Sequence, residues 1–210
     1  MTGQVVDAVA DPAGAVALAA AELRAGRPVV LPTDTVYGVA ALVAEAAAVG
    51  DVFRRKGRDG AKPMAVLVAD ATQAEALTDA DLDVLVDLWP GPLTVVVHRA
   101  PGVELHLGPG AERLGTVGLR CPDHDLVRAL AAEVGPLATT SANRSGRPTP
   151  TAAAEAAAAL GGDLLVLDGG ACTGTPSTVV DLTLVPARIL REGALDASAL
   201  SAAGLEVGPR

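Results

Sequence analysis

Five positively charged residues lie close together in the stretch RRKGRDGAKP, residues 54–63. They are Arg54, Arg55, Lys56, Arg58 and Lys62, and they include both lysines of the chain. Because the whole chain has a formal net charge of −9, this concentration of positive charge predicts a binding site for an anion. Arg54 and Arg55 have a second explanation, since cations in the last turn of a helix stabilise its C-terminus. The other three run on into a loop broken by glycine, where that explanation does not apply.

A second stretch, ATTSANRSGRPTPT at residues 138–151, is rich in hydroxyl and amide side chains. Ser141 and Asn143 are two positions apart in a segment that begins as a strand, so their side chains should point the same way. A hydroxyl and a carboxamide on one side can both donate hydrogen bonds to one ligand. We therefore expect Ser141 and Asn143 to face the basic cluster across one cavity.

A third stretch, DGGACTGTPSTVVD at residues 168–181, places three glycines ahead of Ser177 and Thr178. Glycine lets backbone N–H groups approach an anion closely. An ordinary surface turn explains the same glycines equally well when this stretch is considered alone, so both interpretations stay open.

Several familiar catalytic patterns are absent from the sequence. Neither G-x-x-x-x-G-K-[ST] nor a G-x-G-x-x-G after a strand occurs, which argues against an ordinary P-loop enzyme and a Rossmann dehydrogenase. The three histidines have no i, i+4 pairing, and Cys121 and Cys172 are far apart, so neither a protein-built metal site nor a disulfide framework is expected. Local spacing gives no Cys–His or Ser–His catalytic pair either.

The elements that must position these residues follow from hydrophobic pattern and from Gly and Pro breaks. Helices are predicted over residues 13–25, 44–56, 123–134 and 151–160, with two short helical stretches before Trp89 and a last helix in the final dozen residues. Strands are predicted over residues 29–31, 64–68, 92–99, 116–122, 137–142, 164–168, 177–182 and 187–192. Residues 32–40 are expected to form a binding loop between a strand and a helix. This alternation predicts an α/β fold with a twisted mixed sheet flanked by helices and a basic concave groove.

Composition limits the remaining possibilities. The 210 residues are 50% hydrophobic and only 1% aromatic, which predicts one domain over residues 1–210 with an aliphatic core at about 13–193 and a tail at about 194–210. The excess of acidic residues argues against a protein that coats nucleic acid, although a local basic groove remains possible. No secretory signal or membrane span is recognisable, so we expect a cytoplasmic protein without membrane contact.

The fragments PTDTVYG, KGR…KP, TVGLRCP, SANRSG, STVVD and ILREG occur in this order across residues 32–193. Together they resemble the YrdC-like family of threonylcarbamoyl-AMP synthases, and the K-x-R and S-x-N pair is the most specific of these marks. The resemblance implies a short, single-domain member of the family. It also implies a nucleotidyltransferase that condenses L-threonine, bicarbonate and ATP into threonylcarbamoyl-AMP and pyrophosphate, the first step of threonylcarbamoyladenosine formation in tRNA.

The same resemblance assigns roles to eleven residues. It implies catalytic and ATP-phosphate contacts for Lys56 and Arg58 of K-x-R and for Ser141 and Asn143 of S-x-N. Further ATP contacts are implied for Thr116, Thr149 and Arg191, and threonine contacts for Thr33, Arg120, Thr139 and Ser177. Mg²⁺ is expected to accompany the ATP phosphates, with no metal ligand from the protein. The expected partners are the three substrates, a downstream threonylcarbamoyl-transferase complex, and tRNA or double-stranded RNA.

One departure from the family and two alternatives follow. Some relatives carry a histidine near the amino acid in the strand after K-x-R, where this chain has only MAVLV at residues 64–68. A paralogue that acts on another carbamoyl or acyl substrate would share the nucleotide-binding motifs. An RNA-binding factor in ribosome or tRNA maturation would also use a basic groove.

Overall fold

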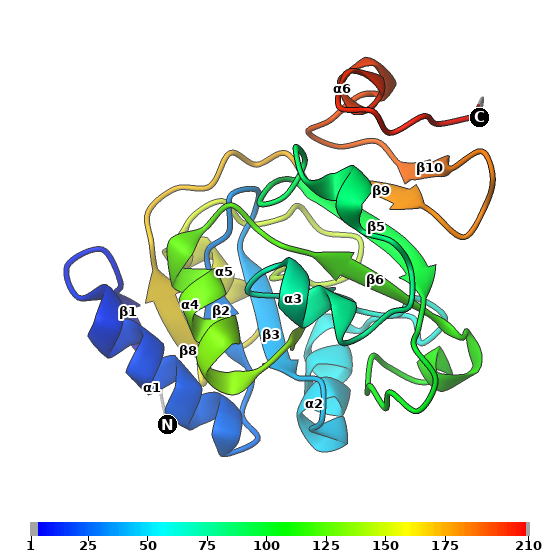
Figure 1. Ribbon diagram of the computed structural model, residues 1–210. Helices are drawn as coiled ribbons and strands as arrows, with labels where there is room; N and C mark the ends of the chain where they lie inside the picture. Colours follow the sequence, from blue (N-terminus) through cyan, green and yellow to red (C-terminus); the bar gives the residue numbers. More distant parts are fainter. Residues whose placement is uncertain (1–3, 209–210) are drawn as a thin grey trace.

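A mixed β-sheet runs through the computed structural model, which describes residues 4–208 (Figure 1). Ten strands of the described residues form it in the order β1-β8-β2-β3-β7-β4-β6-β5-β9-β10. Their bounds are Val5–Asp7 (β1), Val29–Leu31 (β2), Gly38–Leu42 (β3), Ala65–Leu67 (β4), Leu93–His98 (β5), Thr116–Arg120 (β6), Leu137–Ser141 (β7), Leu165–Asp168 (β8), Thr178–Asp181 (β9) and Arg188–Arg191 (β10). The pairs β1-β8, β8-β2, β4-β6 and β5-β9 are parallel, and the other neighbours are antiparallel. The predicted mixed sheet is confirmed.

Helices cover both faces of this sheet (Figure 1). The α-helices are Pro12–Arg24 (α1), Ala46–Lys56 (α2), Ala71–Glu75 (α3), Asp125–Val134 (α4), Ala153–Ala159 (α5) and Ala197–Ala202 (α6), with short 3₁₀ turns at Asp83–Leu85 (η1) and Ala111–Arg113 (η2). Strand β2 separates the two apolar layers, because successive strand side chains point to opposite faces. Val29 and Leu31 pack with α1 and α4, whereas Val30 packs in the larger cluster with α2 and α5.

The end of α2 sets the position of the basic cluster. Lys56 is the last residue of the helix, and Gly57 follows in the left-handed region at φ 59°, a conformation that glycine adopts at little cost. The chain therefore turns sharply between Lys56 and Arg58. As a result, the two basic residues of K-x-R point to different surroundings.

Two strands were not predicted from the sequence. The segment 32–40 is not a loop throughout, because Gly38 begins β3, which lies between β2 and β7 in the middle of the sheet. Its residues GVAAL have weak β-propensity, so pairing on both sides decides their conformation. The other omission is β1, a three-residue edge strand that pairs with β8.

The segment expected to be a tail contributes to the core. Leu200 of α6 and Leu205 are buried in the larger apolar cluster, and Val207 pairs with Ala187 beside β10. None of the helices in the described part of the chain is both long and apolar enough to span a bilayer.

Candidate active site

One cavity of about 790 Å³ opens over the strands from β3 to β10, a size suited to a small-molecule ligand. Nine of the eleven residues that the sequence singled out line it: Thr33, Arg58, Thr116, Arg120, Thr139, Ser141, Thr149, Ser177 and Arg191. The two that do not line it, Lys56 and Asn143, lie directly behind Ser141 and contact each other. Residues that are far apart in the chain thus meet at a single site.

Lys56 is buried, with 3% of its surface exposed. Its ammonium donates to the carbonyl oxygens of Ser141 and Asn143, and the second of these N···O distances is 2.6 Å. The backbone N–H of Ser145 donates in turn to the Lys56 carbonyl at 2.8 Å. Burial, and then the nearby charge of Arg58, lower the pKa of Lys56 to about 8. Lys56 therefore fixes the S-x-N segment from behind the cavity.

Asn143 holds the same loop together. Its amide nitrogen donates to the carbonyl oxygens of Arg144 (2.9 Å) and Arg147 (2.7 Å), and its side-chain oxygen accepts from the Ser141 hydroxyl at 2.5 Å. The side chains of Ser141 and Asn143 thus bond to each other, whereas their spacing predicts that both donate to one ligand. Only Ser141 lines the cavity.

Arg58 carries the charge of K-x-R into the cavity. Its guanidinium donates to the carbonyl oxygens of Lys62 (2.8 Å) and Pro63 (2.9 Å) and to the Thr140 hydroxyl (3.1 Å). It also lies over the Phe53 ring, 5.7 Å from the ring centre, which adds a cation–π contact. All of these partners are neutral, so the charge of Arg58 is not offset by them.

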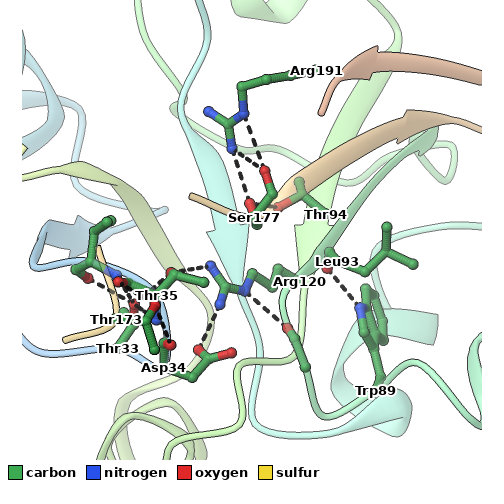
Figure 2. Close-up of polar contacts among 12 residues, drawn as sticks. Thr33, Asp34, Thr35, Trp89, Leu93, Thr94, Arg120, Thr173, Ser177 and Arg191 are labelled. Atoms are coloured by element: carbon green, nitrogen blue, oxygen red, sulfur yellow. Dashed lines mark hydrogen bonds and ion pairs between the residues drawn. The ribbon is translucent and has the colours of Figure 1, made fainter. Parts of the chain in front are cut away.

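Arg191 of β10 holds Ser177, the residue before β9 (Figure 2). It donates twice to the Ser177 carbonyl oxygen, at 3.1 and 2.7 Å, and once to the Ser177 hydroxyl, at 3.0 Å. That hydroxyl also lies 2.9 Å from the Thr94 hydroxyl of β5. Burial, followed by the charge of Arg120, lowers the pKa of Arg191, and the pKa of Arg58 is lowered by burial and by the charge of Arg191. The three arginines therefore repel one another across one site.

Arg120 of β6 is held by three acceptors (Figure 2). Its guanidinium donates to Gly91 O at 3.1 Å, to the Thr35 hydroxyl at 2.9 Å and to Asp34 Oδ1 at 2.6 Å. Burial lowers the pKa of Arg120, while the adjacent Asp34 carboxylate raises it. The Thr33 hydroxyl closes the same turn by donating to Val36 O at 2.7 Å.

The charged side chains that line the cavity in the described residues are all positive. Four of the described residues that line it are basic, Arg58, Lys62, Arg120 and Arg191, and none is acidic. This contrast is large in a chain with 25 acidic and 16 basic residues. Four positive charges in one lining favour a multiply charged anion.

The basic cluster of residues 54–62 divides into two groups. Arg54 and Arg55 form ion pairs with Asp51, and Arg55 also pairs with Asp163 at 2.5 Å. These two arginines lie in the last turn of α2, in agreement with their helix-end interpretation. Arg58 and Lys62 line the cavity.

Two lining or supporting residues were missed from the sequence. Asp34 lies in the fragment PTDTVYG. A carboxylate beside an expected anion site indicates a partner for one of the basic residues, here Arg120. Thr94 lies in the predicted strand 92–99, and it is the only hydroxyl among the apolar residues of LTVVV. Met64, Ala65 and Leu67, from the strand that lacks the histidine of some relatives, give the cavity an apolar wall.

A mixed sheet with a cationic cavity built from K-x-R, S-x-N and the arginines of β6 and β10 defines a known class of protein. The family model described as Telomere recombination, Sua5_yciO_yrdC, matches residues 21–193, and the chain belongs to this Sua5/YciO/YrdC family. The YrdC-like resemblance is confirmed.

Individual relatives agree with this assignment. A Mycobacterium tuberculosis relative is 41% identical over 177 residues, which are 81% of this chain and 80% of the relative. The threonylcarbamoyl-AMP synthase of Bacillus subtilis is 37% identical over 202 residues, covering 92% of this chain and 57% of that protein. The crystal structure of Pyrococcus abyssi Sua5 complexed with L-threonine superposes with a TM-score of 0.82 at 33% identity, covering 92% of this chain and 59% of that one. This chain thus spans less than two thirds of the last two proteins.

Proposed function

We propose that this protein is a threonylcarbamoyl-AMP synthase, which converts L-threonine, bicarbonate and ATP to threonylcarbamoyl-AMP and pyrophosphate. The observation that carries the proposal is a cavity of about 790 Å³ whose described lining contains four basic side chains and no acidic one. The names of the relatives support the same reaction, because a threonylcarbamoyl-AMP synthase matches 92% of this chain. In the proposal, all three substrates bind in this one cavity.

The reaction brings two anions together. The threonine amine forms a C–N bond with bicarbonate and water is lost, and the resulting carbamate attacks the α-phosphorus of ATP. The carbamate oxygen forms a bond to phosphorus, and the bond to the bridging oxygen breaks as pyrophosphate leaves. Repulsion between the two anions grows as water is excluded, so fixed positive charge must offset it. We assign this role to Arg58, Lys62 and Arg191, which line the cavity.

Positioning supplies the second part of the catalysis. Lys56 and Asn143 hold the loop that carries Ser141, and Ser141, Thr116 and Thr149 provide hydroxyls toward the nucleotide in this proposal. We assign Arg120 to the threonine carboxylate, with Thr33, Thr139 and Ser177 nearby in the same lining. Rigid placement of the reacting groups lowers the activation barrier, because the translational and rotational entropy is lost when the substrates bind and not in the chemical step.

Mg²⁺ is proposed as a companion of ATP and not as a ligand of the protein. Hard divalent cations prefer carboxylate, phosphate and water oxygens. The described lining offers no carboxylate, and no cluster of His, Cys, Asp and Glu suited to a metal occurs among the described residues. We therefore assign no catalytic step to a residue-bound metal.

The proposed product is consumed in tRNA modification. A mixed anhydride of this type is an activated acyl donor, so a transferase that accepts the threonylcarbamoyl group must follow. The proposal includes the cytoplasm as the location, because ATP and tRNA are both available there.

A substrate-omission experiment tests the proposed function. Purified protein is incubated with ATP, threonine and bicarbonate, and pyrophosphate is measured as each substrate is left out in turn. We expect pyrophosphate only when all three are present, and much less when serine replaces threonine. Pyrophosphate release without threonine would favour a paralogue that acts on another acyl substrate.

An RNA-binding function is tested separately. Gel shifts with structured RNA are repeated with added ATP. If RNA binds in the cavity, ATP competes with it. RNA binding that ATP leaves unchanged would place the RNA elsewhere on the protein, and a lack of binding would remove this alternative.

A further inference from the structure

The four cations of the cavity differ in how their charge is balanced. Among the ion pairs of the described residues, only one involves a basic residue of this lining, between Arg120 Nη2 and Asp34 Oδ1 at 2.6 Å. Both side chains are largely removed from solvent, with 7% of the Arg120 side chain and 13% of the Asp34 side chain exposed. Arg58 and Arg191 donate instead to carbonyl and hydroxyl oxygens, as described above.

Asp34 reaches Arg120 from outside the cavity. Asp34 lines a second, smaller cavity of about 450 Å³, together with Asp123 and Thr173, and it does not line the first. Thr35 lines both cavities and accepts a hydrogen bond from Arg120. The carboxylate therefore lies behind the arginine, where it offsets the charge without occupying space in the substrate cavity.

The cations of the main cavity consequently differ in how their charge is balanced. Arg58, Lys62 and Arg191 have no paired carboxylate among the described contacts, whereas the charge of Arg120 is offset by Asp34. Asp34 Oδ2 is buried and has no hydrogen-bond partner among the described residues, so Arg120 is the side chain that balances this carboxylate. Two like charges at short range repel strongly in a site of low dielectric. A phosphate, with more than one negative charge, would meet more repulsion from Asp34 than a carboxylate, which needs only the remaining guanidinium donors of Arg120.

From this asymmetry, and resting on the proposed function, we propose that Asp34 is a specificity-determining positioning residue. It fixes the Arg120 guanidinium in one orientation and reserves Arg120 for the carboxylate of the amino acid by excluding phosphate. The phosphates of ATP then bind to lining cations that have no paired carboxylate, Arg58 and Lys62 among them. Asp34 touches neither substrate and acts through Arg120.

The test compares inhibition by pyrophosphate in wild type and in Asp34→Asn. The asparagine keeps an acceptor oxygen for Arg120 but removes the charge. In wild type we expect pyrophosphate to compete with ATP and not with threonine. In Asp34→Asn it should also compete with threonine, with an inhibition constant against threonine lowered by about tenfold or more. Asp34→Glu restores the charge and should restore the exclusion of pyrophosphate at least in part.

Asp123→Asn is the matched control, because Asp123 lines the same second cavity and has no ion pair with Arg120 among the described contacts. It should keep the wild-type inhibition pattern, which separates a specific effect of Asp34 from a general loss of negative charge. An unchanged pattern in folded Asp34→Asn would overturn the proposal.

Calorimetry on the wild type alone gives an answer even if Asp34→Asn does not fold. Threonine is titrated into protein with and without saturating inorganic pyrophosphate. Equal threonine affinity in the two titrations supports the proposal, and displacement of threonine by pyrophosphate refutes it. Absence of any threonine binding, even with ATP and bicarbonate present, would instead refute the proposed function.

Discussion

The Lys56 ammonium reaches the backbone of Ser141 and Asn143, and Arg58 alone of the K-x-R pair lines the cavity. One basic residue thus shapes the site and the other supplies charge within it. Sequence spacing treats the two residues as equivalent, whereas the turn at Gly57 makes their surroundings different. Substitutions of Lys56 should therefore change stability and activity together.

We expect Lys56→Met to lower the free energy of unfolding by about 1–3 kcal/mol, because two partly buried carbonyl oxygens lose their donor. Loss of the ordered loop should reduce kcat/KM for pyrophosphate release by about 2–4 kcal/mol of transition-state stabilisation. Denaturant titration and a pyrophosphate assay measure the two effects. Arg54→Met, at the exposed end of the same helix, should change stability by less than about 1 kcal/mol. Wild-type stability and rate in Lys56→Met would contradict this role.

The lowered pKa of Lys56 also predicts a pH dependence of stability. Its pKa is about 8 in the folded protein, against a model-compound value of 10.5. Between these values the unfolded chain holds a proton that the folded protein has released, so the free energy of unfolding should rise with pH through this window, by up to about 1.4 kcal/mol per pH unit. Below that window both states are protonated, and this contribution is constant. Subtracting the pH profile of Lys56→Met isolates it, and a flat difference above pH 8 would disprove it.

Arg120→Lys keeps the positive charge and loses the planar fork that reaches Asp34, Thr35 and Gly91 at once. We expect the KM for threonine to rise by about tenfold or more, since a lysine cannot make these bonds and also hold a carboxylate with two parallel donors. The KM for ATP should stay within about twofold, because the proposed phosphate contacts are made by other residues and the lysine keeps the positive charge. Kinetics with each substrate varied separately distinguish these outcomes. Equal losses for both substrates would show that Arg120 serves the nucleotide as well.

At the scale of elements, the close approach of β9 and β10 positions Ser177 and Arg191. Gly193 follows β10, and a Cβ there would collide with the backbone of Pro176 and Ser177. The backbone N–H of Ala194 donates to Pro176 O at 2.9 Å, which holds the two segments together. Glycine is thus required for steric reasons at this crossing.

Gly193→Ala should destabilise the protein and displace Ser177 from its place in the cavity. A backbone collision in a packed region costs about 1–3 kcal/mol, and substrate affinity should fall as well. Gly50→Ala is the matched control, because Gly50 lies within α2 and its Cβ would meet nothing within 4 Å. That control should leave activity unchanged and stabilise the protein by about 0.5–1 kcal/mol. Thermal unfolding and substrate titrations test both variants, and equal behaviour of the pair would refute the steric argument.

At the scale of the whole molecule, a net charge of −9 surrounds a cavity lined by four cations. The surface repels ATP at a distance, and the cavity attracts it at close range. Contacts within the cavity must therefore dominate nucleotide binding. Because salt screens exposed charges, ATP binding should depend on salt concentration.

Raising the NaCl concentration from about 0.05 M to about 0.5 M should raise the KM for ATP severalfold, because the Debye length becomes shorter than the cavity. The KM for threonine should change by less than about twofold, since Arg120 is largely buried and already paired with Asp34. Steady-state kinetics at several salt concentrations, with ionic strength matched by a second salt, provide the measurement. An equal rise in both values would indicate a uniform charge along the cavity.

The sequence by itself determined the class of fold, most of the elements and nine of the residues that line the cavity. Apolar runs such as 29–31 and 164–168 are too short for helices, so they indicate strands. Clusters of hydroxyl and cationic side chains between elements are unfavourable in an apolar core, so they indicate a binding site. These signals are local, so they can be read without coordinates. The strand β3 was missed because its Ala-rich residues have weak strand preference, and only pairing with β2 and β7 holds them extended.

The tertiary structure alone decided how the charges are distributed. Nothing in the spacing of Lys56 and Arg58 shows that one lies behind the cavity and the other within it. The pairing of Asp34 with Arg120 joins residues 86 positions apart, and it offsets the charge of one of the four cations that line the cavity. Long-range electrostatic balance depends on distances between segments, and those distances exist only when the sheet has formed.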